Sequence, residues 1–239
     1  MHYTTLALCA VTNYREDESG EIMLNSAEVR WFWDDLRPLG LEDWFRSGGF
    51  PPGGGELRWD SYLIDPGQIE LGIKRRGKKD GVEVKGLVST AMRPLRSDPP
   101  QGTIQMWSKW TSQSLILDEK QTLNIQKTRW LRKFSTDAEV LREIALNADE
   151  MPCSASEKLP LYGCNIELTK ILNTEMKFLG WTLGFEAFGT MSNIEQSLRL
   201  VWEHLTTTGF PPIEGSVELS YPAWLSQHLT KKGPANRPI

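Results

Sequence analysis

Acidic and basic side chains alternate with apolar ones in several segments of this chain. In the segment 69–88, Lys74 and Arg76 lie in one phase of an extended strand, and Glu83 and Lys85 lie in one phase of the next. Each of these strands therefore has one charged face. Such a face lies in water in an ordinary antiparallel hairpin. On successive strands of a closed barrel, it would line a lumen able to bind an anion.

The same spacing of two between charged residues recurs on other segments. A long strand has little reason to carry cations such as Lys127 and Arg129 in one phase unless an anionic group faces them. Burial of an unpaired carboxylate such as Glu167 or Glu186 costs free energy, so these acids need a cation or a metal ion. Cross-strand ion pairs are the structural alternative to a binding site. Further charged residues of this pattern are Glu28, Arg30, Arg58 and Asp60.

About eight strands are expected. Asp80-Gly81 is typical of a tight type I′ turn, so the segment 69–88 is predicted to be a hairpin. The other strands are expected at 3–13, 26–33, 57–64, 103–110, 121–134, 161–172 and 176–188. This pattern favours the α+β class, with an antiparallel β-barrel or tunnel of about eight strands and a few flanking helices. We expect one domain over residues 1–230 and a disordered tail at 231–239.

The flanking helices are predicted mainly from capping patterns. Thr136-Asp-Ala-Glu139 reads as a capping box that opens a helix ending near Asn147. Ser192-Asn-Ile-Glu195 reads as a second capping box, followed by apolar residues at the spacing of an amphipathic helix. A short helix is expected at 36–45, and a last one begins at Ser220, which is a candidate cap.

Composition excludes several classes of function. The net charge of −4 argues against a dedicated nucleic-acid-binding protein, whose domain is normally basic. There is no apolar run long enough to span a bilayer, so we expect no membrane association. Cys9, Cys153 and Cys164 follow no pattern, which predicts reduced thiols and a cytoplasmic location. The three histidines are scattered, so any metal would be a hard cation held by carboxylates.

The order of several short motifs resembles that of the CYTH superfamily, the triphosphate tunnel metalloenzymes. The resemblance covers roughly residues 22–229, and no single motif is intact. Its parts are Ser26-x-Glu28-x-Arg30, Asp60-Ser-Tyr62, the hairpin Glu70–Lys85, Lys127-Thr-Arg129, Gly184-Phe-Glu186-Ala-Phe188 and Ser220-Tyr221-Pro-Ala-Trp-Leu225.

This resemblance implies an eight-stranded antiparallel tunnel that holds a triphosphate or polyphosphate. Cations on one wall would bind phosphate oxygens, and carboxylates on the other would hold Mg²⁺ or Mn²⁺ for hydrolysis. The implied phosphate-binding residues are Arg30, Arg58, Lys74, Arg76, Lys85, Lys127 and Arg129. The implied metal ligands are Glu28, Glu83, Glu167 and Glu186, of which Glu28 and Glu186 would be catalytic.

Three positions depart from the family pattern. Ser26 stands where the opening motif has its first Glu, Arg30 replaces Lys, and Phe188 replaces the second acid of the late pair. Loss of two anionic ligands weakens a site for a hard cation. The sequence therefore leaves three hypotheses open: a metal-dependent phosphohydrolase, a non-catalytic polyanion- or nucleotide-binding protein, and a ligand-free interaction module of the same fold.

Overall fold

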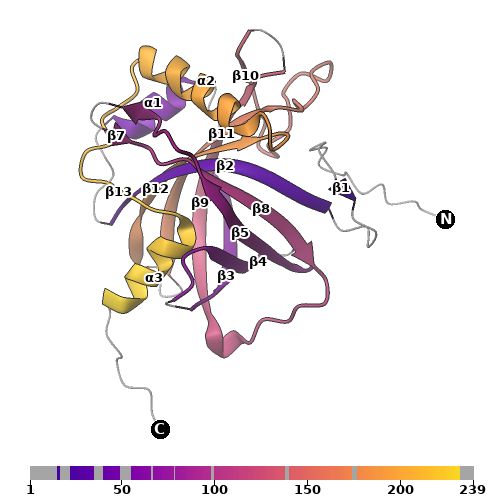
Figure 1. Cartoon of the computed structure of the whole chain (residues 1–239), viewed down its shortest axis with the longest axis vertical. Helices are drawn as coiled ribbons and strands as arrows, with labels where there is room; N and C mark the ends of the chain where they lie inside the picture. Colours follow the sequence, from indigo (N-terminus) through magenta and orange to yellow (C-terminus); the bar gives the residue numbers. More distant parts are fainter. Residues whose placement is uncertain are drawn as a thin grey trace, which may run out of the picture.

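The computed structural model describes residues 15–16, 22–34, 40–48, 55–65, 67–77, 79–97, 100–137, 140–173 and 177–231. Eight antiparallel strands of this part of the chain form a closed barrel, flanked by three α-helices (Figure 1). The predicted α+β class and eight-stranded barrel are confirmed. The barrel strands are β2 (Ile22–Trp33), β3 (Glu56–Leu63), β4 (Leu71–Arg76), β5 (Val82–Thr90), β8 (Gln105–Ser112), β9 (Thr122–Ser135), β11 (Gly163–Asn173) and β12 (Phe178–Phe188).

Around the barrel the strands follow the order β2, β12, β11, β9, β3, β4, β5 and β8, and β8 pairs again with β2. The helices are α1 (Leu41–Ser47), α2 (Ile194–Thr207) and α3 (Tyr221–Lys231). Outside the barrel lie β1 (Arg15–Glu16), β6 (Arg96–Ser97), β7 (Pro100–Gln101), β10 (Arg142–Ile144), β13 (Val217–Glu218) and the 3₁₀ helix η1 (Glu119–Gln121).

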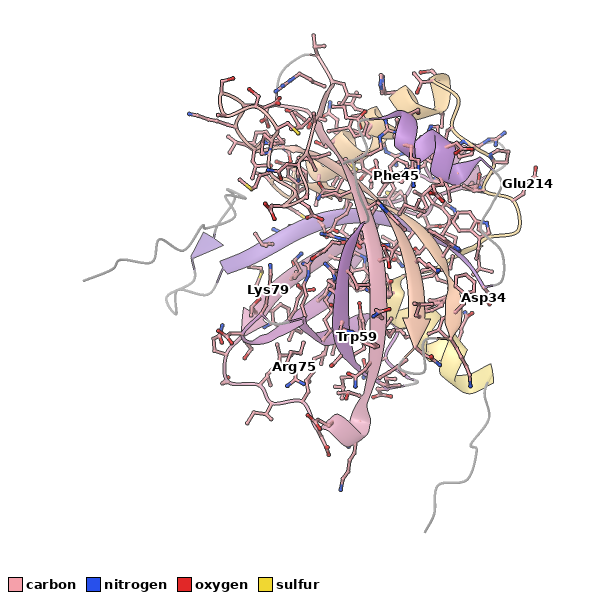
Figure 2. All side chains as sticks on the ribbon, turned by 180° about the vertical axis from the view of Figure 1, so that it is seen from behind. Asp34, Phe45, Trp59, Arg75, Lys79 and Glu214 are labelled. Carbon is pink, nitrogen blue, oxygen red and sulfur yellow. The ribbon has the colours of Figure 1, made fainter. Side chains whose placement is uncertain are left out.

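The alternation of side chains gives the barrel two different faces. On β2, Val29 and Trp31 point outward into the main hydrophobic core, which α1 and α2 cover. Glu28 and Arg30, in the other phase, line the lumen. On the opposite wall, the outward phase includes the partly exposed Trp59 (Figure 2). This part of the lumen is therefore charged, and the main hydrophobic core lies outside it.

Helix α3 packs against the lumen at one end of the barrel, apart from α1 and α2 (Figure 1). Trp224 stacks on Phe32 of β2 with ring centroids 4.8 Å apart, and Tyr221 stacks on Tyr62 of β3 at 5.8 Å. Ser220 caps the helix, because its hydroxyl accepts a hydrogen bond from the N–H of Ala223 at 3.3 Å. The lumen side chains of this end are aromatic and apolar.

The helix predicted from Thr136 is wrong. The Asp137 carboxylate accepts hydrogen bonds from the backbone N–H groups of Leu161 and Tyr162, instead of capping a helix. Farther along, β10 pairs with the end of β9, where Ile144 lies opposite Lys133. The pairing between β3 and β9 ends at Arg129, so the edge of β9 beyond that point is available to β10. Long-range strand pairing therefore determines the structure of this segment, and the local capping pattern does not.

The other sequence predictions differ mainly at the ends of elements. The prediction of a tight turn at Asp80-Gly81 is wrong. The last paired residues of β4 and β5 are Lys74 and Glu83, so the connection between the two strands is longer. Gly81 nevertheless has the expected positive φ of 84°. Helix α1 begins at Leu41, and α2 is preceded by Asn193, whose side chain makes no capping bond. The strand expected at 3–13 and the tail 232–239 lie outside the described residues.

Candidate functional site

A cavity of about 100 Å³ lies inside the barrel, and we call it the charged cavity. All eight barrel strands contribute side chains to it. All eleven site residues predicted from the sequence line it: Glu28, Arg30, Arg58, Lys74, Arg76, Glu83, Lys85, Lys127, Arg129, Glu167 and Glu186. Lys109 and Trp107, which the sequence reasoning missed, line it too, as do Tyr62 and Tyr221, which were named in motifs but given no site role.

Two carboxylates and two lysines form a quartet in one part of the charged cavity. Glu28 lies directly opposite Glu186 across β2 and β12, and Lys85 lies opposite Lys109 across β5 and β8. Lys85 pairs with Glu28, and the Lys109 Nζ lies 3.7 Å from the Glu186 carboxylate. Burial alone would raise the pKa of Glu186, but Lys109 and Lys85 lower it to about 2. Two like charges that face each other are therefore each compensated by a lysine.

Glu167 is held between two arginines. Its carboxylate oxygens lie 2.9 Å from Arg30 and 3.3 Å from Arg129. Despite its burial, these guanidinium groups hold the pKa of Glu167 well below its usual range. The Arg30 guanidinium also lies 5.1 Å from the centre of the Tyr221 ring. Gly184 lies opposite Arg30 and leaves room for it, since a Cβ there would lie 2.5 Å from the Arg30 Cζ.

Three cations share one fully buried carboxylate, that of Asp60. Arg58 lies 3.3 Å from it, Lys127 3.4 Å and Lys74 3.8 Å. Burial alone would raise the pKa of Asp60, but these cations hold it below its usual range. Arg58 also pairs with Glu56, and Lys74 also pairs with Glu83. Among the described residues, the ion pair of Lys127 is with Asp60.

Lys127 is 2% exposed and lies among aromatic rings. It donates a hydrogen bond to the Tyr62 hydroxyl at 2.5 Å, and its Nζ lies 3.8 Å from the centre of the Tyr221 ring. Its burial, with Lys74 and Arg58 nearby, lowers the pKa of Lys127 well below its usual range even though Asp60 opposes the effect. Lys127 is therefore a buried cation whose charge is only partly compensated.

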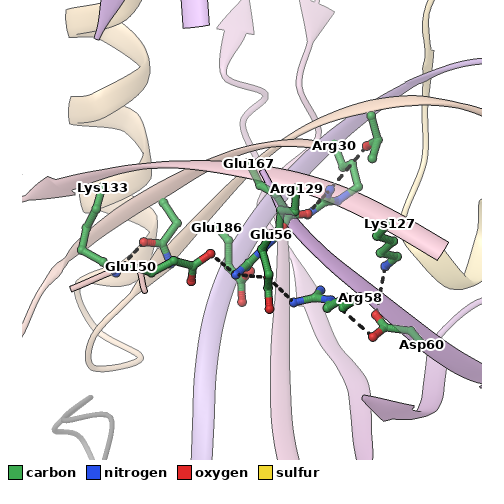
Figure 3. Close-up of polar contacts among 12 residues, drawn as sticks. Arg30, Glu56, Arg58, Asp60, Lys127, Arg129, Lys133, Glu150, Glu167 and Glu186 are labelled. Carbon is green, nitrogen blue, oxygen red and sulfur yellow. Dashed lines mark hydrogen bonds and ion pairs between the residues drawn. The ribbon is translucent and has the colours of Figure 1, made fainter. Parts of the chain in front are cut away.

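Two acids from outside the predicted set approach Arg129 (Figure 3). Glu56 of β3 lies 2.8 Å from the Arg129 guanidinium, and Glu150 contacts the same group from the loop that follows β10. Glu150 has a φ of 60°, which is uncommon for a residue other than glycine. The amide oxygen of Asn147 shapes this loop by accepting hydrogen bonds from the N–H groups of Asp149 and Met151. A strained residue thus places a carboxylate on a lumen arginine.

The carboxylates do not form a ready site for a divalent metal. In the part of the chain that the structure describes, no three acidic, histidine or cysteine side chains are grouped so that they could hold a metal ion. Each of the four acids expected as metal ligands pairs instead with a basic side chain. Since a hard cation needs several oxygen ligands, these residues as arranged do not fit Mg²⁺ or Mn²⁺. The metal expected from the resemblance gains no support here.

No protein-family model matches this chain, and no curated protein matches it either. The resemblance to the CYTH superfamily therefore rests on the order of the motifs and stays a prediction. No helix among the described ranges is long and apolar enough to cross a membrane. Cys153 is exposed and Cys164 is buried, and both are free thiols. The expected cytoplasmic location stays a prediction.

Proposed function

We propose that the barrel binds a small phosphorylated anion in its lumen, as the resemblance to triphosphate tunnel proteins implies. The observation that carries this proposal is the charge of one cavity. Eight basic side chains line it against four carboxylates. Asp60, Glu56 and Glu150 also pair with these cations, so eight cations face seven acids and a formal excess of one positive charge remains. An enclosed excess of this kind is costly without an anion. Arginine and lysine are the residues that proteins use to bind phosphate.

The cations around Asp60 are the best candidates for first contact with the anion. Asp60 is buried and supplies one negative charge to Arg58, Lys74 and Lys127 together. A phosphate group beside Lys127 would supply the missing negative charge. It would also give charge-assisted hydrogen bonds, which are stronger than neutral ones.

The size of the cavity limits how the anion enters. Its volume of about 100 Å³ is smaller than a cavity of about 150 Å³ that holds benzene. A single phosphate group fits this space better than a chain of three. A triphosphate would have to displace internal ion pairs, and the pairs of Arg129 with Glu56 and Glu150 are the ones whose acids are most exposed, at 38% and 32%.

Hydrolysis of the bound phosphate chain is a second candidate function, and one observation favours it. Glu28 and Glu186 face each other across two strands in the same cavity, where a carboxylate could act as a general base toward an attacking water. Lys85 and Lys109 neutralise both acids, so binding requires less rearrangement than catalysis.

Thermal unfolding with tripolyphosphate in the presence of a chelator tests binding. A ligand of the folded state raises the melting temperature, and we expect such a rise without metal. Lys127→Met should reduce it, while Lys79→Ala, an exposed lysine of the β4–β5 connection, should leave it unchanged. If no phosphate compound stabilises the wild-type protein, the proposal fails and the ligand-free interaction module is favoured.

Release of inorganic phosphate from tripolyphosphate and nucleoside triphosphates, with Mg²⁺ or Mn²⁺, tests hydrolysis. Turnover that is lost in Glu28→Ala would favour the metal-dependent phosphohydrolase. Stabilisation by tripolyphosphate without any turnover would favour the non-catalytic binding protein.

A further inference from the structure

A second cavity, lined mostly by apolar side chains, adjoins the charged cavity beside α3. Its volume is about 170 Å³, and we call it the apolar cavity. Three residues line both cavities: Tyr62 of β3, Gly72 of β4 and Pro222 of α3. Its aliphatic lining comes from Leu63, Ile64, Leu71, Ile73 and Leu225. The charged cavity and the apolar cavity are therefore neighbours that share three lining residues.

Gly72 stands at the junction of the two cavities. It lies inside a strand, and its φ is not positive, so its backbone conformation does not require glycine. Glycine inside a strand often marks a close approach by another group. A Cβ at this position would lie 3.1 Å from the Pro222 Cγ. A larger side chain here would occupy the space between α3 and β4, where the cavities meet.

The size and chemistry of the apolar cavity define what it can hold. A cavity of about 150 Å³ accommodates benzene, so about 170 Å³ is enough for one six-membered ring. Its aliphatic lining would bury the ring. Asp65 and Gln68 at its margin can accept hydrogen bonds from polar ring substituents. A phosphate group would find no lysine or arginine among its lining residues, because the described cations of the lumen line the charged cavity.

We infer that the ligand is a phosphate ester of a single-ring organic group, with its phosphate in the charged cavity and its ring in the apolar cavity. This inference rests on the proposed function and narrows it from phosphorylated anions in general to ring-bearing ones. The shared residues Tyr62, Gly72 and Pro222 would lie beside the bond that joins the two parts.

Binding of phenyl phosphate and methyl phosphate, measured by titration calorimetry at pH 8, tests the inference. Both are dianions at this pH, so their affinities differ through the ring. We expect phenyl phosphate to bind the wild-type chain at least about tenfold more tightly, as burial of apolar surface favours binding. In Ile73→Ser and Leu71→Ser, which change residues that line the apolar cavity and not the charged one, this ratio should fall toward one while methyl phosphate binds as before.

A matched control is Ile69→Ser, because Ile69 lies close by in sequence, is 51% exposed and does not line the apolar cavity. It should keep the wild-type ratio. Methyl phosphate serves as the folding control, since a variant that still binds it retains the lumen. Equal affinities of the wild-type chain for the two esters would overturn the ring site and leave anion binding in place. Failure of both esters to bind would overturn the proposed function as well.

Discussion

Lys127 should make the proposed anion binding dependent on pH. Its lowered pKa means that it loses its proton at a lower pH than an ordinary lysine does. Asp60, Tyr62, Tyr221, Lys74 and Arg58 are the groups around it. A bound anion would favour the charged amine and raise this pKa, so binding takes up a proton wherever the free protein has neutral Lys127. Affinity should then fall as the pH rises above the lowered pKa of the free protein.

Sulfate is a suitable probe for this prediction, because its charge is constant above about pH 3. We expect its affinity, measured by calorimetry, to fall already below the ordinary lysine pKa of about 10.4. Lys127→Arg, which keeps its charge throughout this range, should give a flatter profile. A wild-type profile as flat as that of the arginine variant would show that Lys127 does not titrate with binding.

Glu150 pairs with Arg129, a cation that an incoming phosphate could bind. Its carboxylate contacts Arg129, and its side chain is 32% exposed, so the pair contributes little stability. Glu150→Gln removes the competing charge and should strengthen tripolyphosphate binding by about two- to fivefold. Glu157→Gln is the matched control, because Glu157 pairs with Arg142 outside the charged cavity. Unchanged affinity in Glu150→Gln would mean that Glu150 does not compete for the anion.

At the scale of the strand, β12 depends on a glycine for the position of a lumen arginine. Gly184→Ala places a Cβ 2.5 Å from the Arg30 Cζ, so Arg30 must move away from Glu167. We expect a loss of about 1–3 kcal/mol in the free energy of unfolding, measured with urea, because a buried carboxylate loses a partner. Gly86→Ala on β5 is the control, since a Cβ there meets nothing within 4 Å. Equal stability of the two variants would contradict this view of Gly184.

Strand periodicity accounts for most of what the sequence could predict. Because side chains on a strand alternate between its two faces, the spacing of charged residues alone predicts that Glu28, Lys85 and Arg129 face the lumen, as they do. The same rule covers Lys109, which is in phase with the lumen residue Trp107 on β8 and was overlooked. Glu56 also precedes Arg58 by two residues, so its place beside Arg129 followed a signal that was present in the sequence.

Other features depend on contacts that no local pattern encodes. Glu150 reaches Arg129 from a loop outside the barrel, and nothing in its neighbourhood marks it as a lumen residue. Thr136 begins a convincing capping box, but pairing of β10 with β9 decides the structure that follows. The apolar cavity forms between α3 and β4, whose residues are far apart in sequence. Tertiary packing overrides local propensity in these places.

At the scale of the whole molecule, a chain with a net charge of −4 encloses a cationic cavity. Four acids with lowered pKa values keep that cavity from being more positive: Asp60, Glu83, Glu167 and Glu186. A carboxyl group whose folded pKa lies below its unfolded pKa stabilises the fold above the unfolded value and loses this contribution as the pH falls through the folded one. For Glu186, whose pKa Lys109 and Lys85 lower to about 2, this contribution is lost as the pH falls toward that value.

Acid should therefore unfold this barrel by removing the charges that balance its interior. We expect urea stability to fall steeply between pH 4 and pH 2, where Glu186 and its neighbours take up protons. Sodium sulfate at pH 3 should restore more stability than sodium chloride at the same ionic strength, because a dianion can occupy the lumen while general screening is equal in both salts. Lys127→Met should reduce the sulfate advantage, and Lys79→Ala should not. Equal protection by the two salts would mean that the interior charge is balanced without an anion.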